Sequence, residues 1–226
     1  MKLLIVGLGY AGKRYQRAFR HLAGTLDLPL DIAYVARQQR IGEALPYYPD
    51  VPRALAEFHP DVVVVSVNDH AHVGILHNLA GFAGFVLCEK PLAAPGDDWR
   101  SACAGLASAQ GFALDLVERY SEASLRLKER VDGQAWSLIR ASFHWGKDRL
   151  NDYRPTCGVS SEVIHALDLV QWIGAPGATF HLRQAIGIGS DFSLSGPDVP
   201  DTVLLTAALG GAMIAGYSSF VNIQRQ

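Results

Sequence analysis

The amino-acid sequence predicts an α/β fold in two domains: an N-terminal doubly wound parallel sheet, then a C-terminal α+β domain with a mostly antiparallel sheet. Through the first half of the 226 residues, short apolar runs alternate with helical patterns. That alternation is typical of a parallel sheet whose strands are joined by helices. In the second half, strand patterns follow one another directly, which is typical of an antiparallel sheet covered by helices on one face.

Two runs in the first half are the clearest strands. Lys2–Val6 (KLLIV) is short, apolar and followed by glycine, which suits a buried central strand. Val62–Val67 (VVVVSV) is rich in β-branched residues, which favours a sheet buried on both faces. The other expected strands are Asp31–Val35, Phe85–Cys88 and Phe112–Val117, and the expected helices are Ala11–Leu22, Pro52–Phe58, Ala71–Leu79 and Asp98–Ala109.

The pattern changes near Tyr120, which predicts two domains, residues 1–119 and 120–226. Ser160–Ile173 reads as a helix that Gly174 and Pro176 close. Gly210-Gly211 reads as a hairpin turn. The other elements expected here are the charged helix Glu122–Val131 and the strands Ala135–Phe143, Phe180–Ile186, Thr202–Leu209 and Ala212–Val221.

Composition excludes several classes of protein. Hydrophobic residues make up 49% and charged residues 19% of the chain, which is ordinary for a globular protein with a full core. The net charge of −2 does not favour a nucleic-acid or anionic-membrane partner, and no run is long enough to span a membrane. The three cysteines are widely spaced, so we expect reduced thiols and a cytoplasmic location.

The run Gly7-Leu8-Gly9-Tyr10-Ala11-Gly12 is a GxGxxG placed between the first strand and the first helix. In that position the first glycine permits a tight turn, the second lets the backbone approach a pyrophosphate, and the third lets helix and strand pack closely. The helix N-terminus adds unpaired N–H groups and a positive dipole end. The sequence therefore predicts a Rossmann domain that binds a dinucleotide.

The end of the second strand bears on the choice between NAD and NADP. An NAD site usually has an acid there, but Asp31 begins the strand instead of ending it. Arg37 and Arg40 follow the strand and suit a 2′-phosphate, because a guanidinium binds phosphate in a bidentate way. We expect NADP to be preferred over NAD, although both arginines are also consistent with solvated loop residues.

Three motifs stand out in the middle and second half of the chain. They are Ser66-Val67-Asn68 followed by His72, Cys88-Glu89-Lys90-Pro91-Leu92, and the helix Gly158 to Gly174 (GVSSEVIHALDLVQWIG). Together they resemble the motifs of the Gfo/Idh/MocA family of NAD(P)-dependent sugar and polyol oxidoreductases. Glu118-Arg119-Tyr120 and Asp152-Tyr153-Arg154 also resemble family segments. The departures are Ser66 and Val67 in a T-P-N motif, Glu162 where aspartate is usual, and a chain shorter than most members, so we expect a short or truncated member.

The resemblance implies a catalytic site. Lys90 would stabilise negative charge on the substrate oxygen, and His165 would exchange the proton. Glu162 would orient His165 or form a hydrogen bond with a neighbouring hydroxyl group. Tyr153, Arg154 and Asp168 would line the substrate site. Cofactor contacts are expected from Gly7, Gly9, Tyr10, Ala11, Gly12, Arg37, Ser66, Asn68, His72, Glu89 and Lys90.

Structural roles for the same residues stay open. Lys90 also fits an ion pair with Glu89, His165 a buried helix position, and Asp168 an interdomain salt bridge. No metal site is expected, because no fourth ligand joins Glu162, His165 and Asp168.

The resemblance implies hydride transfer between nicotinamide and a hydroxyl or carbonyl carbon of a sugar, nucleotide sugar or cyclitol, in a homodimer or homotetramer that pairs through the C-terminal sheet. Alternatives are an inactive NAD(P)-binding sensor or scaffold, and an enzyme of the same fold that acts on another ketone or imine. No nucleic-acid or membrane partner is expected.

Overall fold

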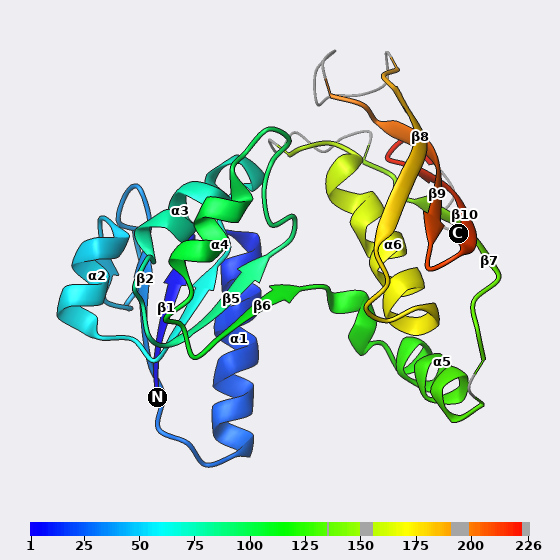
Figure 1. The fold of residues 1–226 in the computed structure, drawn as a ribbon. Helices are drawn as coiled ribbons and strands as arrows, with labels where there is room; N and C mark the ends of the chain where they lie inside the picture. The colour runs from blue at the N-terminus through cyan, green and yellow to red at the C-terminus, as the bar shows by residue number, and fades with distance from the viewer. Residues whose placement is uncertain (135, 150–155, 191–198, 223–226) are drawn as a thin grey trace. The chain divides into compact units, whose positions relative to one another are not determined.

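The computed structural model describes residues 1–134, 136–149, 156–190 and 199–222. The chain forms two compact units, Met1–Asp115 and Leu116–Gln226, and each contains its own sheet (Figure 1). The boundary that the sequence predicts, between residues 119 and 120, falls inside the short 3₁₀ helix η2 (Val117–Tyr120). The predicted α/β fold is confirmed.

The sheet of the first unit has six parallel strands in the order β3-β2-β1-β4-β5-β6 (Figure 1). The chain begins at the centre of this sheet and runs first to one edge and then, from β4, to the other. The carboxyl ends of β1 and β4 therefore mark the switch point at which such sheets bind ligands. The strands are β1 (Lys2–Val6), β2 (Asp31–Val35), β3 (Tyr47–Tyr48), β4 (Val62–Val65), β5 (Phe85–Glu89) and β6 (Gly111–Asp115).

Both faces of this sheet are buried, which explains why its strands are apolar throughout. On one face Leu4 and Val6 of β1 pack in a core with α2 (Val51–Phe58), α3 (His72–Asn78) and α4 (Trp99–Gly105). On the other face Leu3 and Ile5 pack with side chains of α1 (Tyr10–Thr25). Alternation of side chains along one strand thus supplies both cores.

The β1–α1 turn requires glycine at two positions. Gly7 has a φ of +93°, and a Cβ there would lie 2.6 Å from the carbonyl oxygen of Ser66. A Cβ on Gly12 would lie 2.2 Å from the carbonyl oxygen of Gly7. The Ser66 hydroxyl donates a 2.8 Å hydrogen bond to that same Gly7 oxygen. The turn is therefore packed directly against the end of β4.

In the second unit the described residues form a four-stranded sheet in the order β7-β10-β9-β8. β7 runs parallel to β10, and the other neighbours are antiparallel. Val170 of α6 (Ser160–Gly174) packs on the inner core of Leu209 and Ile214. The remaining elements are α5 (Glu122–Gly133), β7 (Arg140–Gly146), β8 (Phe180–Ile188), β9 (Thr202–Leu209) and β10 (Ala212–Ser219).

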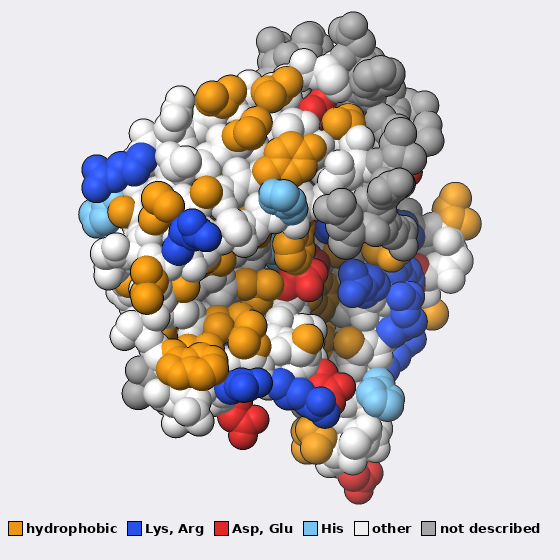
Figure 2. All heavy atoms as spheres, turned by 90° about the vertical axis from the view of Figure 1, so that its right-hand side faces the viewer, with side chains coloured by type: hydrophobic (Ala, Val, Ile, Leu, Met, Phe, Trp, Pro, Cys, Tyr) orange, Lys and Arg blue, Asp and Glu red, His pale blue; other side chains and the backbone are white. Residues whose placement is uncertain are grey.

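The outer face of this second sheet exposes apolar side chains. Ile186, Leu204 and Met213 are 49%, 42% and 56% exposed. Figure 2 shows hydrophobic side chains among polar ones on the face that it draws. In the described part of the chain, no helix combines the length and the apolarity that crossing a bilayer requires.

Some predicted element bounds were wrong. The strand expected at Ala135–Phe143 forms at Arg140–Gly146, because its ladder with β10 begins at the pair Met213–Arg140. The helix expected at Asp98–Ala109 ends at Gly105. The short edge strand β3 (Tyr47–Tyr48) carries no signal in the sequence, since only pairing with β2 defines it.

Replacing Gly12 with alanine is expected to destabilise the protein by about 1–3 kcal/mol, because the added methyl group meets backbone that cannot move away. Gly24, near the end of the same helix, is the matched control, since a Cβ there meets nothing within 4 Å. Gly24→Ala should be neutral or stabilise by up to about 1 kcal/mol. Urea unfolding of both variants measures the difference, and equal effects would refute the close packing of this turn.

Candidate functional site

The N-terminus of α1 fits a phosphate group. Gly9 is the residue before the helix, and no side chain caps the helix end. A Cβ on Gly9 would meet nothing within 4 Å, so the backbone there is open to a ligand. The first N–H groups of a helix have no intrahelical acceptor and favour an anion. Among the predicted contacts here, Tyr10 is 73% exposed.

The loop after β2 holds several charges. Arg37 and Arg40 are both exposed, and the Arg40 backbone N–H donates a 2.9 Å hydrogen bond to the Tyr34 hydroxyl. An ion pair that was not predicted from the sequence also lies here, between Lys13 of α1 and Glu43. The hydrogen bond from Lys13 holds the pKa of Glu43 below its usual range. The position of Lys13, directly after Gly12, was the available signal.

His72 lies under the strand ends and does not face solvent. Its side chain is fully buried, with Nδ1 2.5 Å from the Pro91 carbonyl oxygen and Nε2 3.3 Å from the Val67 carbonyl oxygen. The shorter contact favours the tautomer that carries its proton on Nδ1. His72 therefore connects the segment after β4 with the segment after β5. The nearby Asn68 is exposed.

The end of β5 brings three acidic or phenolic groups together. Glu89 and Asp115 are register partners at the ends of β5 and β6. The Tyr15 hydroxyl of α1 lies 3.0 Å from Glu89 Oε1 and also contacts Asp115 Oδ2. Lys90 follows Glu89 directly, and the peptide bond from Lys90 to Pro91 is cis. Tyr15 and Asp115 were not singled out from the sequence.

Cys88 is a poor candidate nucleophile. Its side chain is fully buried in the core of β5. Burial raises the pKa of the Cys88 thiol to about 12, so the thiol stays protonated. It is a packing residue of the first unit's core.

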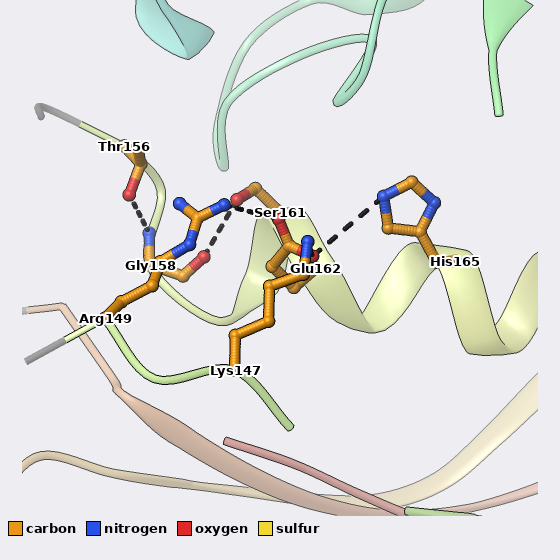
Figure 3. A network of polar contacts seen from close by, with 7 residues as sticks. All are labelled: Lys147, Arg149, Thr156, Gly158, Ser161, Glu162 and His165. Atoms are coloured by element: carbon orange, nitrogen blue, oxygen red, sulfur yellow. Dashed lines mark hydrogen bonds and ion pairs between the residues drawn. The ribbon is translucent and has the colours of Figure 1, made fainter. Parts of the chain in front are cut away.

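In the second unit, Glu162 and His165 are buried on the same face of α6, with side chains 1% and 3% exposed. Glu162 Oε2 is 4.0 Å from His165 Nε2. Two cations at the end of β7 hold the Glu162 carboxylate (Figure 3), with Lys147 Nζ 2.5 Å from Oε2 and an Arg149 guanidinium nitrogen 2.9 Å from Oε1. A buried carboxylate needs such partners to remain ionised.

The indole ring of Trp145 packs against the imidazole ring of His165. The two rings are stacked, with centroids 5.9 Å apart and planes at 29°. The start of the helix is ordered by Ser161, whose hydroxyl donates a 2.9 Å hydrogen bond to the Gly158 oxygen (Figure 3). Lys147 and Arg149 were missed from the sequence because their contacts depend on where β7 ends relative to α6.

Asp168 is engaged by Arg119. Arg119 Nε donates a 2.7 Å hydrogen bond to Asp168 Oδ2, and a terminal guanidinium nitrogen donates to Oδ1. Both residues belong to the second unit. The guanidinium of Arg119 also lies 5.7 Å from the ring centroid of Trp172. A substrate role for Asp168 remains a prediction, and the predicted Tyr153 and Arg154 contacts lie outside the described residues.

The chain is similar to known oxidoreductases. Residues 1–113 match the Gfo/Idh/MocA family model, described as an oxidoreductase family with an NAD-binding Rossmann fold. Inositol 2-dehydrogenase of Salmonella paratyphi B is 22% identical over 190 residues, which cover 76% of this chain and 54% of that protein. The same enzyme from Salmonella typhimurium matches equally. The chain thus spans about half the length of the curated relatives it matches.

Solved structures share the fold of the whole chain. GenD2 from gentamicin A biosynthesis, in complex with NAD, has a TM-score of 0.80 at 19% identity, covering 100% of this chain and 67% of that one. The WlbA dehydrogenase from Bordetella pertussis, in complex with NADH and UDP-GlcNAcA, has a TM-score of 0.79 at 16% identity, covering 100% and 68%.

Replacing His72 with alanine is expected to destabilise the protein by about 2 kcal/mol or more, because the Pro91 oxygen loses its donor and a buried ring is removed. His77→Ala, at an exposed position of the same helix, is the control and should stay within about 0.5 kcal/mol of wild type. Chemical denaturation measures both. A His72→Ala protein as stable as the control would contradict the connecting role of this ring.

Proposed function

The chain belongs to the Gfo/Idh/MocA family of NAD-binding oxidoreductases, and from this premise we propose that it transfers a hydride between a nicotinamide cofactor and a hydroxyl or carbonyl carbon of a sugar, nucleotide sugar or cyclitol. The observation that carries the proposal is that one chain contains both halves of the required machinery. The first unit has the glycine turn and Lys90, and the second has the buried Glu162 and His165 of α6.

Each residue of the proposed mechanism has a separate task. The cofactor, when bound, supplies the hydride acceptor or donor. The ammonium of Lys90 stabilises negative charge that develops on the substrate oxygen. His165 takes the hydroxyl proton during oxidation and returns it during reduction. Glu162 fixes the orientation of His165, and the Lys147 and Arg149 contacts hold Glu162 in place.

We propose NADP as the preferred form of the cofactor, with NAD as the alternative. Arg37 and Arg40 are exposed just after β2, where a 2′-phosphate would lie. Lys13 adds a third cation nearby, but its charge is already paired with Glu43. In this proposal Arg37 is the principal phosphate ligand.

We also propose a homodimer or homotetramer that pairs through the outer face of the second sheet, where Ile186, Leu204 and Met213 are exposed. Burying such side chains favours association. Light scattering that finds a monomer would contradict this.

We propose a cytoplasmic location, because all three cysteines are free and thiols stay reduced in the cytosol.

Calorimetric titration is expected to show tighter binding of NADPH than of NADH, with the preference lost in Arg37→Ala. Asp31→Ala, at the exposed start of β2, is the control and should leave the preference unchanged. Tighter NADH binding would discard Arg37 as a phosphate ligand but keep the oxidoreductase. If a folded sample binds neither form, the proposed function is wrong.

Replacing Lys90 with alanine is expected to lower kcat by about 100-fold or more while the affinity for NADPH changes by less than about threefold, because the charge acts on the transition state. Turnover is measured over a panel of sugars, nucleotide sugars and cyclitols. Equal losses of kcat and cofactor affinity would refute the assignment. Cofactor binding with no turnover by the wild type on any panel member would indicate a binding protein without catalysis.

A further inference from the structure

The contacts of the Tyr15 hydroxyl with Glu89 and Asp115 depend on how many protons these three groups hold together. The phenol has one hydrogen, and its oxygen lies within hydrogen-bond distance of two carboxyl groups. A hydroxyl donates one hydrogen bond and accepts others. If both carboxyl groups were ionised, one of the two contacts would set a phenol lone pair against a carboxylate oxygen.

A single added proton removes this conflict. The Tyr15 hydrogen goes to Asp115, which is the shorter of the two contacts. Glu89 then carries the added proton and donates it to the Tyr15 oxygen over 3.0 Å. Each of the two contacts then has one donor and one acceptor.

We propose that Glu89 is protonated and neutral, and that its carboxyl group donates a hydrogen bond to Tyr15 while Tyr15 donates one to Asp115. The two carboxyl groups at the ends of β5 and β6 then carry one negative charge instead of two. Glu89 is then a positioning residue and not a cofactor ligand. The inference rests on the proposed function for its consequence: a neutral Glu89 adds no negative charge beside the Lys90 ammonium that is proposed to act on the substrate oxygen.

The surroundings of Glu89 agree with this arrangement. Burial, followed by repulsion from Asp115, raises the pKa of Glu89, and the Tyr15 hydrogen bond and Lys90 only partly oppose the shift. The pKa of the Tyr15 phenol is also raised, first by burial and then by Glu89, so the phenol keeps its hydrogen. The titratable groups that face Glu89 are thus Tyr15 from α1, Asp115 from β6 and Lys90 next to it in the chain.

The proton is detected without any assay of activity. The infrared spectrum of wild type minus Glu89→Gln at neutral pH is expected to contain the C=O stretch of a protonated carboxyl group, shifted in ²H₂O. Glu57→Gln, an exposed acid of the same unit in an i,i+4 pair with Arg53, is the control and should give only carboxylate bands. A Glu89→Gln difference with carboxylate bands alone would overturn the proposal.

Stability against pH gives a second readout. A raised folded-state pKa makes a stabilising contribution that is complete below the unfolded pKa and is lost as the pH rises through the folded pKa. Glu89→Gln lacks this loss, so its unfolding constant should fall relative to that of wild type by up to about tenfold per pH unit across that window. Urea unfolding from pH 5 to pH 8 measures it, and a ratio that is flat or moves the other way would overturn the proposal.

The proposal also predicts how kcat depends on pH. In an active wild type, kcat should decline on the alkaline side as Glu89 ionises, and Glu89→Gln, which has no carboxyl group to ionise, should lack that decline. A decline that is the same in both proteins would overturn the role of Glu89 towards Lys90. If no substrate is turned over, the proposed function fails, but the infrared and stability results still decide whether Glu89 holds the proton.

Discussion

The close approach of the β1–α1 turn to the end of β4 is the constraint on which the rest of the first unit depends. Gly7 and Gly12 allow it, because a side chain at either position would overlap backbone atoms. Ser66 reinforces it with a hydrogen bond to the Gly7 oxygen. The approach sets the position of α1 relative to the sheet, and Tyr15, one turn after Gly12, thereby reaches the ends of β5 and β6.

In the second unit the corresponding constraint is charge compensation around α6. Glu162 and Asp168 are buried acids of this helix, and each has basic partners from another segment: Lys147 and Arg149 for the first, Arg119 for the second. Ionised groups are costly to bury without such partners. The same contacts hold the side chains in one geometry, which is what the catalytic role proposed for His165 requires.

The sequence predicted features that depend on local pattern. Apolar runs located the strands of the first sheet other than β3, and the glycine spacing located the turn that begins α1. The helix with Glu162 and His165 was predicted almost to its observed bounds. These signals are carried by residues close together in the chain, whose periodicity is set by the backbone itself.

The partners of the site residues were not predictable in this way. Tyr15 and Asp115 are 100 positions apart, and Arg119 and Asp168 are 49 apart. Their meeting depends on strand register and on the rotation of a helix about its axis, and a slip of one residue in β6 would turn Asp115 to the opposite face. The roles expected for Tyr153 and Arg154 stay predictions.

The stacking of Trp145 on His165 has an optical consequence. An imidazolium quenches the fluorescence of a neighbouring indole much more strongly than a neutral imidazole does, because it accepts an electron from the excited ring. Of the four tryptophans in the sequence, Trp145 is the one found stacked on a histidine in the described part of the chain. The protein therefore contains its own emission reporter for the protonation state of His165, at the position where proton exchange is proposed.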